Sequence, residues 1–303
     1  MSKVDITAIV LTHNESIHLG RCIESLSEIV KAVVIVDSYS TDSTIDIAIA
    51  KGAKCYQNTW INYAVQFQWA LDNVEINTEW VMRIDADEYL EQETSKNIEV
   101  INNLDKNITG IIVTRKYYFM GQWIKYGAMY PIYHLKIWRN GVGRIEDKWM
   151  DERILLSHGA SIAIDISIVD DNKNNLTWWT NKHNGYATRE MIDSLNLDHG
   201  FLTTDLIGYN SGSLQSKFKR FVKENIYSNI PLFVRPLFYF LYRYFIRLGF
   251  LDGTKGLIFH FLHALWYRVL VDAKIFEAQG WIGNERDPEK IAKILKDKTS
   301  LKL

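Results

Sequence analysis

A cluster of acidic residues follows a short apolar run in the sequence VMRIDADEYL, residues 81–90. Alternate residues of an extended chain point to the same side, so Asp85 and Asp87 can present two carboxylates to one ligand where the strand ends. Like charges this close require a cation, and Mg²⁺ or Mn²⁺ commonly binds through one or two carboxylates together with substrate phosphates. The motif therefore predicts a divalent metal site that a phosphate-bearing substrate completes. The alternative is that Asp85 caps the next turn while Asp87 and Glu88 face solvent.

Polar residues also follow two earlier apolar runs. Asp37 comes directly after VVIV, and AIVL leads into Thr12, His13, Asn14 and Glu15. Ligands of parallel sheets bind at the carboxyl ends of the strands, so we expect these groups to converge with the acidic cluster at one edge. For Asp37, an N-cap or an Asx turn that opens the following helix is the competing interpretation.

The elements that position these residues alternate between strand and helix. Short apolar runs predict strands, and apolar residues three and four apart predict helices. The predicted strands span residues 6–12, 32–37, 54–58 and 79–85, and the predicted helices span residues 16–29, 43–53 and 63–74. This order predicts an α/β fold with a mostly parallel central sheet flanked by helices.

The character of the chain changes twice after this first half. Residues 110–124 and 133–141 are rich in aromatic residues and predict antiparallel strands. From residue 211 to residue 274 the sequence holds ten Lys or Arg, three Asp or Glu, and fifteen Phe, Tyr or Trp. We therefore predict a domain over residues 1–210, with its two halves meeting near residue 110, and a basic, aromatic, helical region over residues 211–303.

Composition narrows the class of protein. The chain has 303 residues and a formal net charge of −1, which gives no overall attraction to nucleic acid. It has only two cysteines and no start that resembles a secretory signal, so we expect a reducing, cytoplasmic setting. The longest apolar region, residues 231–250, is interrupted by Arg235, Arg243 and Arg247, and this pattern predicts no membrane span.

Two common nucleotide sites do not match the sequence. A dinucleotide-binding dehydrogenase should have G-x-G-x-x-G after its first strand, where this chain has LTHNES. The chain also has no GxxxxGK[ST] loop. A phosphate-bearing ligand must therefore be held by a metal ion and side chains.

Four motifs in order, AIVLTHNE, VVIVDSYSTDST, QFQWAL and RIDADEYL, closely resemble the inverting family 2 glycosyltransferases of the GT-A fold. The resemblance covers roughly the first 155 residues. The stretches GQWIKYGAMYPIYHLKIWRNG and WWTNKHNGYATRE resemble the bacterial lipopolysaccharide-core glucosyltransferase branch of that family. Residues 1–110 would then form the nucleotide-binding half, and residues 111–210 the acceptor-side half.

The resemblance implies roles for the residues at the strand ends. Asp85 would approach the ribose and the metal ion, and Asp87 would ligate the metal across the diphosphate. Arg83 would face the nucleotide, with pairing to an acidic neighbour as the alternative. The nucleotide-sugar would also contact Thr12, His13, Asn14, Glu15, Asp37 and Gln66, while Gln66 and Gln68 replace the polar or basic residues usual there.

A further carboxylate is needed as a general base, because inverting transfer removes the proton of the acceptor hydroxyl as it attacks. The stretch RIEDKWMDERI supplies four acids, and the resemblance assigns the base to Asp151, with Glu152 as the second candidate. The alternative is a solvated acidic face that balances Lys148 and Arg153.

Several residues could meet the acceptor. Trp123, Tyr130 and Trp138 could stack on a sugar, although aromatic residues at such spacings more often pack a core. Lys182, His183 and Arg189 lie in a predicted helix and could contact an acceptor phosphate or the donor diphosphate.

The C-terminal region combines cationic residues with abundant Phe, Tyr and Leu. This composition favours association with a membrane surface, and a buried helical subdomain or an oligomer contact is the alternative. Single-stranded nucleic acid is disfavoured, since the basic residues lie within long apolar runs.

The sequence thus predicts transfer of a sugar, UDP-linked, to a hydroxyl of a lipopolysaccharide-core or other lipid-linked glycan, with inversion and with Mg²⁺ or Mn²⁺. The enzyme would work peripherally at the cytoplasmic face of the inner membrane. The alternatives are a sugar-nucleotide nucleotidyltransferase and a non-catalytic nucleotide-sugar-binding protein.

Overall fold

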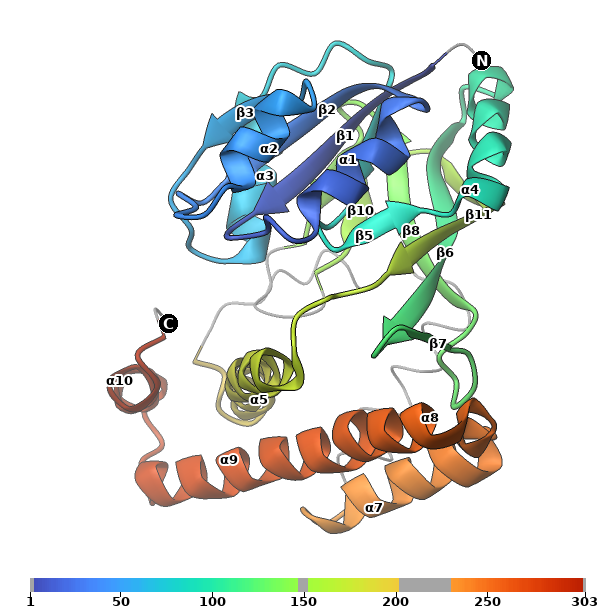
Figure 1. Cartoon of the computed structure of the whole chain (residues 1–303). Coiled ribbons are helices and arrows are strands. Elements are labelled where there is room, and N and C mark those ends of the chain that lie inside the picture. The colour runs from blue at the N-terminus through green and yellow to red at the C-terminus, as the bar shows by residue number, and fades with distance from the viewer. Residues whose placement is uncertain (1–2, 147–151, 202–229, 302–303) are drawn as a thin grey trace. The chain divides into compact units, whose positions relative to one another are not determined.

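The computed structural model describes residues 3–146, 152–201 and 230–301 (Figure 1). The chain forms two compact units. The first contains residues 1–146 and 152–173, and the second contains residues from 174 onward. The sequence placed the boundary near residue 210, whereas the units divide between Lys173 and Asn174.

The first unit is an α/β domain with helices on both faces of a sheet (Figure 1). Every strand and helix that the sequence predicted in residues 6–85 is present. In chain order the elements are β1 (Val4–Thr12), α1 (Leu19–Ser27), β2 (Val30–Asp37), α2 (Thr44–Ala50), β3 (Lys54–Gln57), α3 (Tyr63–Asn73), β4 (Trp80–Arg83), β5 (Glu88–Leu90), α4 (Gln92–Ser95), the 3₁₀ helix η1 (Lys96–Asn103), β6 (Ile108–Phe119), β7 (Gln122–Ile124), β8 (Ile132–Arg139), β9 (Gly143–Ile145), β10 (Ile154–Leu156) and β11 (Ala160–Asp170).

The central sheet is mixed, which corrects the prediction of a mostly parallel sheet. Among the described residues it has nine strands, in the order β3-β2-β1-β4-β8-β6-β11-β5, with β7 paired to β6. Strands β3, β2, β1 and β4 are parallel to one another, as predicted. Strand β8 then pairs antiparallel with both β4 and β6, so the second half of the sheet departs from the α/β alternation. The overall architecture of this unit is an α/β fold with a mixed sheet.

Strand β1 runs through the centre of the unit and is buried on both faces. Its side chains alternate between two apolar cores: Ile6, Ala8 and Val10 enter one, while Ile9 and Leu11 enter the other. Such continuous apolar runs are typical of a parallel strand covered by helices on both sides. The first core contains Leu19, Cys22, Ile23 and Leu26 of α1, and the second contains Ala64, Phe67 and Ala70 of α3.

The carboxyl ends of β1, β2 and β4 lie at the same edge of the sheet. Thr12 pairs with Asp37 in the β1–β2 register, and Ile9 pairs with Arg83 in the β1–β4 register. The polar residues that follow these strands are therefore brought together, as the sequence predicted.

The second unit is helical. Its described elements are α5 (Leu176–His199), α7 (Val234–Leu241), the π-helical turn η4 (Tyr242–Ile246), the 3₁₀ helix η5 (Gly249–Asp252), α8 (Gly253–His260), the π-helical turn η6 (Phe261–Trp266), α9 (Tyr267–Ile282) and α10 (Pro288–Thr299). Its core joins α5, α9 and α10 through residues such as Met191, Leu195, Ile275 and Leu295. None of the described helices has both the length and the apolar composition that a membrane crossing needs.

Candidate active site

The carboxylate of Asp37 organises the turn between β2 and α2. Its Oδ1 accepts hydrogen bonds from Thr12 Oγ1 (2.8 Å) and Ser40 Oγ (2.5 Å), and its Oδ2 accepts one from the Ser40 backbone N–H (2.8 Å). Asp37 has no exposed surface. These bonds form a turn after β2, whereas the N-cap of α2 is Ser43, so Asp37 does not cap that helix. A direct contact between Asp37 and a nucleotide base would require some of these bonds to be exchanged.

The loop after β1 is held against the loop after β2. His13 Nδ1 lies 3.0 Å from the Ser38 carbonyl oxygen, and the Asn14 backbone N–H donates to Ser40 Oγ at 2.8 Å. Asn14 has a positive φ of 56°, a conformation that Asn tolerates better than most residues, and its Oδ1 accepts from the Thr41 N–H. The side chains of His13 and Asn14 are exposed, so this rigid pair of loops offers a ligand-facing surface.

Gln66 is buried and its side chain is occupied by protein partners. Its Nε2 donates to Ser38 Oγ and to the Asn58 carbonyl, both at 3.1 Å, and its Oε1 accepts from Asn58 Nδ2 at 2.8 Å. Gln66 therefore positions the loop after β2. Gln68 Oε1 accepts instead from the Ile145 backbone N–H at the start of the β9–β10 hairpin connection.

Residues 85–88 form a turn after β4, so Asp85 and Asp87 do not lie in the extended conformation that the spacing suggested. The Glu88 N–H donates to the Asp85 carbonyl oxygen at 2.9 Å, and the Asp85 N–H donates back to Glu88 Oε2 at 3.0 Å. Asp87 Oδ2 accepts a hydrogen bond from Asn172 Nδ2 at 2.8 Å. Asp85 is thus bound to Glu88 through its backbone, whereas the side chain of Asp87 is bound by Asn172.

Asp85 is held in its charged form by its neighbours. The Tyr63 hydroxyl donates a hydrogen bond to Asp85 Oδ1 at 2.5 Å, and Lys136 Nζ lies 3.8 Å from Asp85 Oδ2. Burial by itself would raise the pKa of Asp85, but the charges of Lys136 and Arg83 outweigh it and hold that pKa well below its usual range.

Glu88 is part of the interior, so the alternative interpretation, in which it faces solvent, is wrong for this residue. It is 1% exposed, and its Oε2 accepts from Lys136 Nζ at 2.6 Å. Burial raises the pKa of Glu88, an effect that the charge of Lys136 offsets only in part. Lys136 is itself buried, so the two form a desolvated ion pair.

The cationic side chains change the electrostatic argument for a metal ion. The charges of Lys136 and Arg83 already hold the pKa of Asp85 low, so the protein does not need a divalent ion to keep Asp85 charged. Among the described residues, no group of three or more His, Cys, Asp or Glu is arranged to hold a metal. Asp85 Oδ2 lies beyond hydrogen-bond distance of Lys136, and Asp87 Oδ2 accepts from Asn172, so the turn presents two carboxylates that separate partners hold.

Glu152 is connected to the acidic cluster through Arg83. Arg83 Nη1 donates to the Glu152 carbonyl oxygen at 3.1 Å, and Arg83 Nε donates to Tyr63 Oη at 3.0 Å. Tyr63 in turn binds Asp85, so a chain of hydrogen bonds joins Glu152 to the edge of the sheet. Asp151, the first candidate for the base, lies outside the described residues, and Glu146 is 6% exposed.

Sequence reasoning missed the residues that hold the acidic cluster. They are Tyr63, Lys136 and Asn172, which come from α3, β8 and the segment after β11. Only Lys136 left a signal, as a charged residue within the apolar strand run YHLKIW.

The aromatic candidates differ in their environments. Trp138 has no exposed surface and packs edge-on against Phe67 at 6.0 Å, which confirms core packing for this residue. Trp123 and Tyr130 are half-buried and form an edge-to-face pair with ring centroids 5.0 Å apart. Lys116 Nζ lies 4.8 Å from the Trp123 ring centroid, so a cation already covers this ring.

The three basic candidates on α5 belong to the second unit. His183 stacks on Trp179 at 3.5 Å and its Nδ1 lies 2.8 Å from the Trp179 carbonyl oxygen; burial lowers the pKa of His183 to about 4. Lys182 Nζ lies 4.6 Å from the Trp178 ring centroid, and Arg189 lies over the Tyr186 ring at 5.8 Å.

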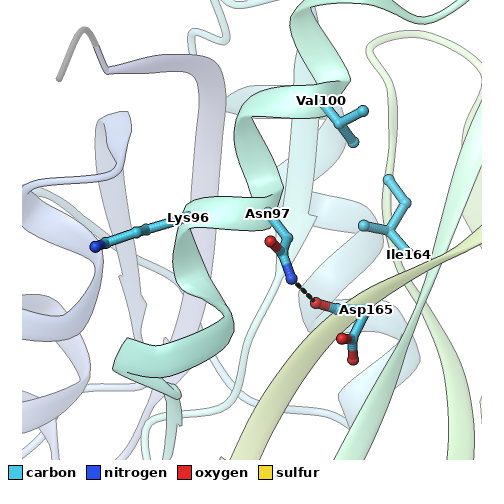
Figure 2. A pocket seen from close by; sticks show the side chains of 5 residues that line it. All are labelled: Lys96, Asn97, Val100, Ile164 and Asp165. Carbon is cyan, nitrogen blue, oxygen red and sulfur yellow. Dashed lines mark hydrogen bonds between the residues drawn. The ribbon is translucent and has the colours of Figure 1, made fainter.

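A surface hollow of about 330 Å³ lies elsewhere, between η1 and β11. Figure 2 shows its lining residues, Lys96, Asn97, Val100, Ile164 and Asp165, with Lys96 directed away from the others. Asn97 Nδ2 donates to the Asp165 carbonyl oxygen at 2.6 Å (Figure 2). These residues bring together no reactive or metal-binding groups, so the strand edge remains the candidate site.

Comparison with known proteins gives the same assignment as the motifs. The sequence model described as Glycosyl transferase family 2 matches residues 7–171. An uncharacterized glycosyltransferase of Rickettsia felis is 41% identical over 96 residues, 32% of this chain and 33% of that protein. The lipopolysaccharide core biosynthesis glycosyltransferase LpsC of Rhizobium meliloti is 32% identical over 149 residues, 48% of this chain and 54% of that protein. The chain thus spans a third to about half of the length of these relatives.

A solved structure is similar over a smaller part of the chain. It is glucosyl-3-phosphoglycerate synthase from Mycobacterium tuberculosis in complex with Mn²⁺, uridine diphosphate and glucosyl-3-phosphoglycerate. The two are 21% identical with a TM-score of 0.31, and the match covers 38% of this chain and 44% of that one.

Proposed function

Because the chain belongs to glycosyl transferase family 2, we propose that it transfers a sugar from a nucleotide diphosphate sugar, UDP-linked, to an acceptor hydroxyl with inversion. One observation carries this proposal: the ionised carboxylate of Asp85 lies at the carboxyl edge of the sheet and is linked through Tyr63 and Arg83 to Glu152. Donor and acceptor groups of the reaction would thus meet on one hydrogen-bonded framework.

The donor would lie on the loops after β1 and β2. The exposed side chains of His13 and Asn14 would contact the nucleoside, on a frame that Thr12, Asp37 and Gln66 keep rigid. Asp85 and Asp87 would hold Mg²⁺ or Mn²⁺ against the diphosphate. When bound, the ion would stabilise the negative charge of the departing nucleoside diphosphate.

The base would come from the segment that contains Asp151 and Glu152. One of these carboxylates accepts the proton of the acceptor hydroxyl while the oxygen of that hydroxyl attacks the anomeric carbon and the bond to the diphosphate breaks. Arg83 holds the backbone of this segment through the Glu152 carbonyl, and acts as a positioning residue.

The acceptor would be a lipopolysaccharide-core or other lipid-linked glycan at the cytoplasmic face of the inner membrane. Similarity to LpsC supports this acceptor class. Trp123 and Tyr130 would contribute an aromatic surface for its sugars, and Lys182, His183 and Arg189 of the second unit remain candidates for its phosphates.

Thermal stabilisation by nucleotide sugars tests the proposal, because a ligand that binds only the folded state raises the melting temperature. We expect a UDP-sugar to raise it in the presence of Mn²⁺ and Asp87→Asn to remove the effect of the ion. Asp297→Asn, an exposed aspartate on α10, is the control. If no member of a nucleotide-sugar panel stabilises the wild-type chain with either ion, the donor assignment is wrong.

A further inference from the structure

Helix α7 and the turn η4 expose a stripe of large apolar side chains. Val234, Phe238, Tyr242 and Ile246 recur every four residues, and a second row lies beside them. The second row consists of Phe233, Leu237, Leu241 and Phe245. All eight are exposed, and Ile246 is 72% exposed.

The π-helical turn helps to keep this stripe on one side. In an α-helix a spacing of four residues overshoots one turn by about 40°, so a row with this spacing drifts around the axis. The wider turn at Tyr242–Ile246 holds more residues and reduces this drift at the end of the stripe.

The charged residues of this helix point the other way, into the unit. Arg235 donates to Asp272 Oδ1, and Arg243, which is 3% exposed, lies with its Nη1 2.9 Å from His263 Nδ1. Arg243 also lies over the ring of Phe259 at 5.9 Å. The segment is therefore inverted relative to a water-exposed helix, with its cations inside and its Phe, Leu and Ile side chains outside.

The segment that follows η4, from η5 to η6, also exposes large apolar side chains. Leu248, Phe250 and Leu251 at η5 are exposed, as are Leu257 on α8 and Phe261 on η6. We call these five residues and the eight of the stripe the apolar hairpin face. Helix α7 contacts η6, and η4 contacts η5 and α8, so the residues of the face belong to one packed hairpin of the second unit (Figure 1).

The charged residues of this segment indicate which kind of partner the apolar hairpin face would bind. Residues 230–266 contain four Arg or Lys and a single acid, Asp252. Asp252 is 7% exposed, while Arg247 is exposed and Lys255 partly so. The charge that the segment presents to its surroundings is thus positive, which matches anionic lipid headgroups next to an apolar layer.

We propose that the apolar hairpin face inserts into the interfacial layer of an anionic lipid bilayer without crossing it. Its Phe, Leu and Ile side chains enter the boundary between headgroups and acyl chains, and the exposed Arg247 meets the phosphates. An interface with another protein normally includes polar groups that pair across it. Among the eight side chains of the stripe, the only polar group is the Tyr242 hydroxyl. This inference uses the second unit alone and stands independently of the transferase proposal.

Flotation of the full chain with lipid vesicles tests the inference. We expect the wild-type protein to float with vesicles of phosphatidylethanolamine and phosphatidylglycerol, without any nucleotide sugar, and to bind vesicles of pure phosphatidylcholine more weakly. Phe245→Glu combined with Ile246→Glu should weaken binding roughly tenfold or more, since two charges would enter the apolar layer. Ile49→Glu on α2, where the native side chain is 61% exposed, is the matched control and should float as the wild type does.

Insertion is measured separately from binding with a polarity-sensitive fluorophore on Ile246→Cys, in a Cys55→Ser background. We expect a blue shift of its emission on vesicles and no shift for the same label on Ile49→Cys. Equal flotation of the double variant and the wild type, or an unshifted label at position 246, overturns the proposal. So does a lipid-free dimer that the double variant converts to a monomer while neither protein binds vesicles, because a second copy would then cover the face.

Discussion

The hydroxyl of Tyr63 donates a hydrogen bond to the carboxylate of Asp85 at 2.5 Å. The same oxygen accepts a hydrogen bond from Arg83 Nε at 3.0 Å, and the Arg83 guanidinium lies 4.3 Å from the Tyr63 ring centroid. One phenol therefore fixes the distance between the acid at the strand end and the cation that reaches the Glu152 backbone.

Tyr63→Phe should loosen this arrangement while it preserves the packing of the ring. We expect the free energy of unfolding to fall by about 1 kcal/mol, the usual contribution of one hydrogen bond. Donor binding should weaken roughly tenfold, since Asp85 loses the contact that orients it. Isothermal titration with a UDP-sugar measures the effect, and Tyr133→Phe, at an exposed position on β8, should leave affinity unchanged.

Lys136→Met should be strongly destabilising because it leaves Glu88 buried without its cation. Breaking a buried ion pair from one side costs about 3–5 kcal/mol. The double variant Lys136→Met with Glu88→Gln should recover much of that loss, since neither charge remains. Lys31→Met, which breaks an exposed pair with Asp5, should cost under about 1 kcal/mol in the same urea titration. Additive losses in the double variant would show that the pair is not coupled.

Asp42 makes the loop contacts sensitive to acid. Burial raises its pKa, but the hydrogen bonds from Thr44 and Ser16 together outweigh burial and lower the pKa of Asp42 to about 2, from 3.8. A lowered pKa in the folded state adds stability at pH values above 3.8, and that stability is lost as the pH falls from about 4 to about 2. Asp42 is exposed, so we expect Asp42→Asn to cost at most about 1 kcal/mol at pH 7 and almost nothing near pH 2. Thermal melts across this range give the difference.

Substitution of the two candidate bases should separate their roles. We expect the variant that removes the base, Asp151→Asn or Glu152→Gln, to lower kcat by roughly a thousandfold with donor affinity retained, because proton removal is lost while the donor site is intact. Glu146→Gln, at a buried acid of the same region, is the control for general damage to the fold. Near wild-type turnover in both Asp151→Asn and Glu152→Gln would exclude this segment as the source of the base.

The local sequence pattern was sufficient to predict the strands and helices of residues 6–85. The apolar run of β1, the spacing of Leu19, Cys22, Ile23 and Leu26 in α1, and the acids at the strand ends are all readable over a few residues. These features depend on burial of neighbouring positions, which periodicity reports directly. The convergence of Thr12, Asp37 and Asp85 at one edge followed from the rule for parallel sheets.

Contacts between segments that lie far apart in the sequence could not be predicted from the local pattern. The insertion of β8 between β4 and β6 makes the sheet mixed, and nothing in the local sequence of these strands specifies that order. Lys136 and Asn172 reach the acidic cluster from segments far along the chain, so their pairing with Glu88 and Asp87 depends on the finished topology. The charge argument for a metal ion therefore did not include Lys136, because the local sequence does not show that this lysine pairs with Glu88.

The position of β8 also has a consequence during synthesis of the chain. Strand β4 pairs with β1 on one edge, but its other edge is covered only by β8, Ile132–Arg139. At translation rates of roughly 5–20 residues per second, the nascent domain spends seconds with this apolar strand edge unpaired on the ribosome. Open strand edges recruit other strands, so this interval is when the protein is most exposed to aggregation and to capture by a chaperone.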